Sequence, residues 1–379
     1  MAYKVQPGAI GCAIRPVIAG RDRSLEEIMY DTAQLALADA GLSIRDIDGI
    51  VVGSNDQFDG RAISVMMASG PVGGVDRDLL STPSASEHAF VMGALRVASG
   101  QFRTQLVVSW SPTEASSLSE AQRLGADPYF HRTLPLDELS AHAMQAAALE
   151  NAVPGLREVA AAVAEKNRRH GQLAYPSSPP PSGRARWPLT AEMTTEPVTG
   201  AVAVVLAAPE FIAERGISDV AWLRGMGWAT EASFLGDRDL ATAPALAAAA
   251  QQAYAAAGIT DPAGAIDVAE VTDATPYSEL LAYEGLSLCD RDAWSARIAD
   301  GSFAAGGRLP VNLSGGVLTF NPVFCTGLIR IAEIANQVRG RAGTHQKPNV
   351  RQGLAHAGSG FAMQYQTAVV LSAAREARP

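Results

Sequence analysis

Ser84 and His88 are the first side chains in this sequence whose types and spacing could do chemistry. The helical pattern of residues 87–100 begins between them, which predicts a turn from a strand into a helix at Ser84. The free N–H groups at a helix start stabilise developing negative charge. A serine hydroxyl still needs a base, and His88, one turn further on, could serve as that base. The alternative is that Ser84 only caps the helix.

A second group of candidates follows the apolar run 265–271. Asp273 could take part in proton transfer, but a carboxylate at such a place more often caps a helix or stabilises a turn, and we favour that role. Tyr277 could act as an acid that reaches a pocket, although a tyrosine here is more often part of the pocket wall.

The third group lies in a glycine-rich segment, residues 306–327. Glycines suit a backbone that passes close to a ligand, and the amides of Asn312 and Asn321 could form an oxyanion hole. Cys325 stands at the start of a predicted helix over 326–339, where a thiolate would be stabilised, or it is a buried packing residue. A further run, 355–360, contains His356, a candidate base. The predicted ligand-binding positions of these two segments are Asn312, Ser314, Gly315, Gly316, Gly358 and Gly360.

The elements that must position these groups occur twice along the chain. An alanine-rich helix over 31–41 ends at a glycine and is followed by the apolar run 50–53, and the same order recurs at 244–258 and 265–271. Each half also ends in a short apolar strand, at 201–207 and 367–372. This alternation predicts a duplicated α/β fold of five layers, αβαβα. The expected division is 1–112 with 196–215, an inserted loop region over 113–195, and 216–379.

Composition excludes several classes of function. The chain has 379 residues, 47% of them hydrophobic, and a net charge of -9, which argues against a nucleic-acid partner. Three scattered cysteines form neither a disulfide framework nor a zinc site, and no metal-ligand spacing is present. No secretory signal is evident, and no apolar run approaches the ~20 residues that span a bilayer. We therefore expect a cytoplasmic protein without a membrane association.

The run Asn312-Leu-Ser-Gly-Gly316, with Asn321-Pro322 and Thr326-Gly327 after it, resembles the catalytic loop of the thiolase superfamily. The segment 270–289 is similar to the sterol-carrier-protein type of thiolase, and the whole chain resembles the lipid-transfer-protein branch. The resemblance implies a thiolase-like α/β fold with Ser84 at the place of the nucleophilic cysteine. It also implies that Thr272 and Asn321 replace the two catalytic histidines, and that His356 stands where the C-terminal loop usually has a cysteine.

The resemblance further implies a CoA thioester as substrate, with coenzyme A as part of the substrate and no tightly bound cofactor. Some members of this branch are retro-aldolases that work with a small OB-fold partner protein, and two tyrosines stand in those enzymes at the places of Thr272 and Asn321. The superfamily also suggests a homodimer. Lys166 to His170 could contact a CoA phosphate, although a solvated helix end is the favoured alternative.

Three hypotheses follow. The first is a lyase that cleaves a β-hydroxyacyl-CoA by a retro-aldol step, because this reaction asks only for a base and for donors to the enolate oxygen. The second is an acyltransferase that is acylated on Ser84 or Cys325. The third is a non-catalytic scaffold that binds acyl-CoA.

Overall fold

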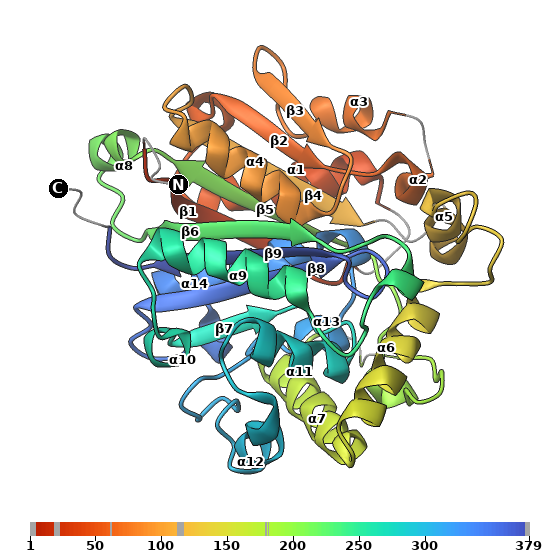
Figure 1. The fold of residues 1–379 in the computed structure, drawn as a ribbon. Coiled ribbons are helices and arrows are strands. Elements are labelled where there is room, and N and C mark those ends of the chain that lie inside the picture. Colours follow the sequence, from red (N-terminus) through yellow and green to blue (C-terminus); the bar gives the residue numbers. More distant parts are fainter. Residues whose placement is uncertain are drawn as a thin grey trace.

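The computed structural model describes residues 5–18, 23–60, 63–111, 117–178, 180 and 182–375. Its strands form one mixed sheet in the order β3-β2-β4-β5-β1-β6-β9-β8-β7 (Figure 1). The strands span Gly8–Arg15 (β1), Gly49–Gly53 (β2), Asp78–Thr82 (β3), Thr104–Ser111 (β4), Gly200–Ala207 (β5), Ala221–Thr230 (β6), Val268–Val271 (β7), Gln352–Ser359 (β8) and Tyr365–Ser372 (β9). β1 and β6 touch through two residue pairs only, Gly8 with Trp222 and Ala9 with Ala221, so the sheet consists of two halves joined at this seam.

The two half-sheets repeat the same pairing pattern. In the first, β2 is parallel to β4, and β5 is antiparallel to both β4 and β1. In the second, β7 is parallel to β8, and β9 is antiparallel to both β8 and β6. A parallel bridge from Ala269 to Val311 extends the second half where β3 extends the first. The duplication predicted from the sequence is thus visible in the strand order.

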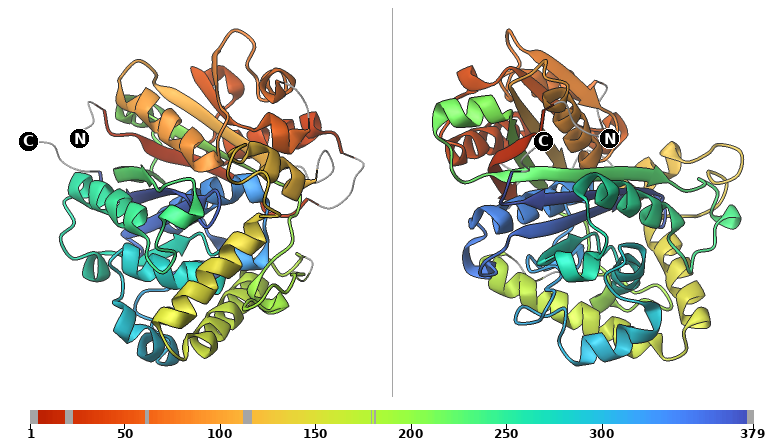
Figure 2. Two further views of the ribbon diagram at one scale, coloured as in Figure 1. Left: turned by 45° about the vertical axis from the view of Figure 1, so that its right-hand side comes forward. Right: turned by 60° about the vertical axis from the view of Figure 1, so that its left-hand side comes forward.

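Helices cover both faces of each half-sheet (Figures 1 and 2). Their bounds are Leu25–Asp39 (α1), Asp56–Asp59 (α2), Ser64–Ser69 (α3), Ser86–Ala98 (α4), Leu118–Gly125 (α5), Glu138–Ala152 (α6), Leu156–Ala174 (α7), Pro209–Arg215 (α8), Pro244–Ala257 (α9), Pro262–Ala265 (α10), Pro276–Gly285 (α11), Trp294–Ala299 (α12), Gly316–Thr319 (α13) and Thr326–Arg339 (α14). α1 packs on the outer face of the first half, and α9, α7 and α11 share a core with the outer face of the second. α4 and α14 lie together between the half-sheets, which gives the five predicted layers and confirms the fold class.

Local signals account for several element ends. The side chain of Ser24 accepts from the N–H of Glu27, and the Glu27 carboxylate accepts from the N–H of Ser24, so a capping box begins α1. α9 ends at Gly258, whose φ of +68° is the left-handed conformation that glycine adopts without strain. α14 has the bounds expected from the sequence.

Between β4 and β5 the chain makes an excursion that contains α5, α6 and α7. α5 packs on α2 of the first half, whereas α6 and α7 pack on α11 of the second half. The excursion therefore contacts both halves of the fold (Figure 2). The domain boundary expected at 112 and 113 lies outside the described residues. Within the described ranges, no helix is both long and apolar enough to cross a lipid bilayer.

Candidate active site

Part of the predicted site borders a cavity of about 490 Å³. Its wall includes five of the predicted residues, from both halves of the fold: Ser84, Thr272, Asn321, Gly358 and Gly360. A second cavity, of about 470 Å³, adjoins the first and shares wall residues with it. The shared residues are Phe58, Gln122, Glu138, His142, Ala274, Asn321 and Val323. Residues far apart in the sequence thus form one composite site.

Ser84 precedes α4, and its hydroxyl lies 2.6 Å from Nδ1 of His88. The N-cap position of α4 belongs to Ala85, which makes no side-chain capping bond. Ser84 therefore does not cap the helix, and the predicted pairing with His88 is present. The ring of His88 also packs edge-on against Tyr365, with ring centroids 6.0 Å apart, so the imidazole has a defined orientation. This pair has the geometry of a hydroxyl with a neighbouring base.

Thr272 and Asn321 have different roles in the wall. The hydroxyl of Thr272 donates to the carbonyl oxygen of His356 at 3.3 Å and accepts from the N–H of Gly358 at 3.1 Å, so it ties the end of β7 to the glycine-rich end of β8. The Asn321 amide donates to the carbonyl oxygen of Thr195 at 3.4 Å, and Asn321 borders both cavities. Neither side chain can act as a general base at neutral pH.

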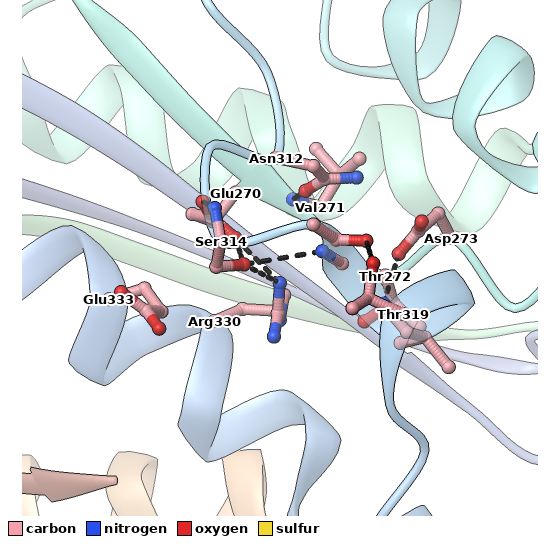
Figure 3. Close-up of polar contacts among 12 residues, drawn as sticks. Glu270, Val271, Thr272, Asp273, Asn312, Ser314, Thr319, Arg330 and Glu333 are labelled. Atoms are coloured by element: carbon pink, nitrogen blue, oxygen red, sulfur yellow. Dashed lines mark hydrogen bonds and ion pairs between the residues drawn. The ribbon is translucent and has the colours of Figure 1, made fainter. Parts of the chain in front are cut away.

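Behind the cavity wall, Glu270, Ser314 and Arg330 form a buried cluster (Figure 3). One Arg330 nitrogen, Nη1, lies 2.6 Å from Glu270 Oε2 and 2.6 Å from Ser314 Oγ. Ser314 donates its hydroxyl and its backbone N–H to the two Glu270 oxygens. Burial raises the pKa of Glu270, and the Arg330 charge opposes that rise. Ser314 is thus a structural residue whose hydroxyl is fully engaged away from the cavity.

Asp273 holds the turn that follows Ser314. Its carboxylate accepts from the backbone N–H groups of Val317, at 2.6 Å, and Leu318, at 3.4 Å, and from the Asn167 amide at 2.6 Å. Gly316 has a φ of +67°, and a Cβ there would stand 2.2 Å from an Asp273 oxygen, so only glycine fits. Burial raises the pKa of Asp273 to about 8, and the nearby Glu279 carboxylate adds to the shift. Asp273 has the structural role that the sequence favoured.

Asn312 does not supply an oxyanion hole. Its side-chain oxygen accepts from the backbone N–H of Val271 at 2.7 Å, and its amide donates to Glu279 at 2.8 Å. The side chain is fully buried and does not border either cavity. The expectation is corrected because both polar atoms of the amide hold the loop against β7 and α11.

Lys166 and His170 likewise face the interior of the protein. The Lys166 ammonium lies 2.8 Å from Glu279 and donates to the carbonyl oxygen of Val311 at 2.9 Å. His170 contacts the carbonyl oxygen of Asn312 at 3.0 Å, and burial lowers the pKa of His170 to about 4. These two side chains do not form a solvated helix end and point away from the surface where a CoA phosphate would bind, because α7 turns them toward the loop.

Three other predicted residues lie outside the cavity. Cys325 is fully buried, its thiol points to the carbonyl oxygen of Gly200 at 3.6 Å, and burial raises its pKa. This corrects the expectation of a stabilised thiolate, since loss of solvent outweighs the helix start. The Tyr277 hydroxyl donates to Glu150 instead of reaching the cavity. His356 is fully buried against Gln366, at 2.7 Å, and borders neither cavity.

The inserted excursion was expected to pack over the site, but none of its residues was predicted to line the cavity. His131, Glu138 and His142 come from this segment and border the larger cavity. The only local signal is that Glu138 and His142 are four residues apart and therefore share one face of α6. Which face would meet the cavity depends on tertiary packing. Among the described residues, no group of three or more His, Cys, Asp or Glu side chains is placed to hold a metal ion.

Comparison with known proteins gives a consistent answer. Residues 227–373 match the thiolase C-terminal domain-like family. The chain is 37% identical over 109 residues to sterol carrier protein 2 from Homo sapiens, which is 28% of this chain and 20% of that relative. It thus spans about a fifth of the length of that relative.

Two solved structures cover nearly the whole chain. The Ltp2-ChsH2(DUF35) aldolase superposes with a TM-score of 0.80 at 20% identity, over 98% of each chain. A monomeric SCP2-thiolase like protein type 1 from Mycobacterium smegmatis gives 0.72 at 17% identity, over 99% of this chain and 79% of that one. Together these findings confirm the resemblance to the thiolase superfamily and its sterol-carrier-protein branch, and the structures show the thiolase fold.

Proposed function

We propose that this protein binds a CoA thioester in the composite cavity and cleaves the bond between the α and β carbons of a β-hydroxyacyl-CoA. The observation that carries the proposal is that Ser84 lies in the cavity wall with its hydroxyl 2.6 Å from Nδ1 of His88. The resemblance to thiolases puts Ser84 at the place of their nucleophile. Cleavage is also supported by a structurally similar protein, Ltp2-ChsH2(DUF35), which is named an aldolase. A steroid or lipid side chain is the class of acyl group that the branch suggests.

Ordinary thiolysis has little support at this site. It needs a nucleophile that carries an acyl group and a base that takes a proton from the α carbon. Cys325 is a buried thiol with a raised pKa. The resemblance to thiolases puts Thr272 and Asn321 at the places of the two catalytic histidines. A retro-aldol step has smaller requirements, because no acyl-enzyme is formed.

The proposed cleavage begins at the β-hydroxyl group. A base takes the proton of the β-hydroxyl, the Cα–Cβ bond breaks, and the β carbon leaves as the carbonyl of an aldehyde or ketone. The electron pair moves to the α carbon and is shared with the thioester oxygen as an enolate. Ser84 donates its hydroxyl proton to the α carbon and is reprotonated through His88, which yields the shortened acyl-CoA. The start of α4, directly after Ser84, provides a positive potential for the enolate.

The second candidate is an acyltransferase that is acylated on Ser84. It is favoured by the same 2.6 Å contact, since His88 could take the hydroxyl proton as Ser84 attacks a thioester. A scaffold that only binds acyl-CoA is the third candidate. For the assembly, we propose an OB-fold partner or a homodimer. One structurally similar protein is named as a complex, Ltp2-ChsH2(DUF35), and another is named as monomeric.

Intact-protein mass spectrometry after incubation with a panel of acyl-CoAs tests these readings. For the lyase we expect no covalent adduct, together with release of an aldehyde or ketone and a shortened acyl-CoA from a β-hydroxyacyl-CoA. Ser84→Ala should slow the release by roughly 10²-fold or more. Cys325→Ala is the matched control and should leave it unchanged. An acyl adduct that is lost in Ser84→Ala would contradict the lyase and support the acyltransferase. Binding of acyl-CoA without an adduct and without cleavage would support the non-catalytic scaffold.

A further inference from the structure

His142 has an unusual position at the junction of the two cavities. It comes from the first turns of α6, its exposed fraction is only 4%, and it borders both cavities. Within the residues that the structure describes, neither of its ring nitrogens has a hydrogen-bond partner. Buried polar groups in native proteins nearly always have partners, so an imidazole in this state beside a cavity requires an explanation.

Glu138 lies one helical turn before His142 on the same face of α6. One of its carboxylate oxygens, Oε1, is 3.8 Å from Nε2 of His142. The other, Oε2, accepts a hydrogen bond from the side-chain amide of Gln122 in α5. The carboxylate is thus held in place from the far side, and it offers a negative charge to an imidazole that gains a proton.

His131 provides a contrast in the same cavity wall. Its ring stacks on Phe234 with centroids 5.2 Å apart, and its Nε2 accepts the backbone N–H of Leu235 at 3.4 Å. His131 therefore has a structural explanation within the protein. His142 lacks such partners, and the cavity is the side from which a partner can come.

We propose that His142 is the catalytic base that accepts the β-hydroxyl proton of the substrate, and that Glu138 is a positioning residue acting through His142. The inference rests on the proposed function and names the group that performs its first proton transfer. The imidazole takes the hydroxyl proton as the Cα–Cβ bond breaks, and Ser84 with His88 returns a proton to the α carbon. His142 then loses its proton to water and His88 takes one up from water, so the protein ends the cycle as it began.

These roles of His142 and Ser84 imply that each cavity holds a different part of the substrate. Ser84 borders only the larger cavity, where the resemblance to thiolases puts the thioester. His142 and Asn321 border both cavities, so a hydroxyl at the junction lies next to the imidazole. The second cavity then receives the substituent of the β carbon. It is lined by polar groups including Asp137, Arg184 and Thr195, so we infer that this substituent has hydrogen-bonding groups of its own.

His142→Ala tests the catalytic part of the proposal. We expect kcat for cleavage of a β-hydroxyacyl-CoA to fall by roughly 10²-fold to 10⁴-fold, with KM little changed. Added imidazole should restore part of the rate, because the vacated space opens onto both cavities. Glu138→Gln should lower kcat by roughly tenfold without a matching change in KM. Met144→Ala, on the same helix but 48% exposed and outside both cavities, is the control and should keep the full rate.

Calorimetric binding of 3-hydroxyhexanoyl-CoA and hexanoyl-CoA to protein that carries Ser84→Ala, in which cleavage is slow, tests the contact with the hydroxyl. We expect Ser84→Ala alone to bind the hydroxylated probe several-fold more tightly, and Ser84→Ala combined with His142→Leu to bind the two equally. If His142→Ala keeps more than a tenth of kcat, or loses its rate through KM with no rescue by imidazole, the inference is overturned while the proposed function stands. If the unmodified protein binds neither probe, the proposed function itself fails. If His142→Ala does not fold, His142→Gln takes its place, and loss of kcat with retained binding is expected.

Discussion

The loop behind the cavity and the wall of the cavity use polar residues in opposite ways. At the loop, Ser314 bonds with Glu270 of β7 and Arg330 of α14. Asp273 accepts from two backbone N–H groups of the loop and from the Asn167 amide. In the wall, His142 has no hydrogen-bond partner among the described residues, and Ser84 contacts His88 of the helix that follows it. The segment with the most recognisable sequence is therefore a scaffold. The chemistry lies with residues that the scaffold and the inserted excursion bring together.

The two regions also respond differently to burial. Burying a charged side chain costs free energy unless the charge is paired. The charged side chains of the scaffold are fully buried, and nearly all of them have their partners inside the protein. The wall is only partly enclosed, so its polar groups can exchange a protein partner for a substrate atom. Substitutions in the loop should therefore act first on stability, and substitutions in the wall should act first on turnover.

The largest effect expected from this comparison is that of Arg330→Met. It leaves Glu270 buried without its cation, and the loss of one partner of a buried pair costs about 3–5 kcal/mol of unfolding free energy. The cost should shrink as the pH falls, because Glu270 can then be neutral. Urea unfolding at several pH values measures both effects. The control is Arg297→Met, whose pair with Asp300 is exposed and contributes less than about 1 kcal/mol. Equal costs for the two variants would contradict the scaffold role.

The second effect is that of Gly316→Ala. An alanine there has a left-handed φ of +67° and places its Cβ 2.2 Å from the Asp273 carboxylate, which the turn holds in place. Backbone strain and the clash together should cost about 2–4 kcal/mol. Gly340→Ala is the matched control, because Gly340 has a φ of +72° and nothing within 4 Å of the added Cβ. It should cost only the strain, about 1–2 kcal/mol, by the same denaturation measurement. If the two substitutions lower the unfolding free energy equally, the turn held by Asp273 shifts to accommodate the added Cβ and is not rigid.

Much of the fold could be predicted because its signals are local. The alanine-rich helices with their C-cap glycines, the apolar strands and the repeat of the two halves are all visible in short windows of sequence. α14 has the predicted bounds, and the capping box at Ser24 begins α1. The pairing of Ser84 with His88 was also predictable, since residues four apart on a helix start are neighbours whatever the fold.

The direction of individual side chains could not be predicted in the same way. Asn312 precedes the glycines of the loop and was predicted to bind a ligand. Its amide is instead hydrogen-bonded to the backbone of Val271 and to the Glu279 carboxylate. Cys325 stands at a helix start, yet the side chain points inward, and burial decides its pKa. His142 is one histidine in an alanine-rich helix, and only the packing of α6 on α11 brings it to the cavity. Each of these outcomes depends on contacts between segments far apart in the chain.

The third prediction concerns His356, which is adjacent to the cavity wall but behaves as part of the scaffold. Burial lowers its pKa to about 4, and the hydrogen bond with Gln366 only partly opposes this. His356 is protonated near pH 6.5 in the unfolded chain, whereas in the folded protein it is protonated only near pH 4. Stability is therefore lost as the pH falls through this window, by roughly 1.5 kcal/mol between pH 6.5 and 5.

His356→Gln should flatten that acid-side slope, whatever its cost at neutral pH, because glutamine does not titrate. Urea unfolding of both proteins at pH 5, 6.5 and 8 gives the comparison. Above pH 7 their stabilities should differ by a constant amount, since histidine is then neutral in both the folded and the unfolded state. His170, whose pKa burial also lowers to about 4, keeps part of the slope in the variant. If the stabilities of the two proteins change with pH in parallel over the whole range, His356 reaches solvent. It would then belong to the cavity wall and become a candidate base.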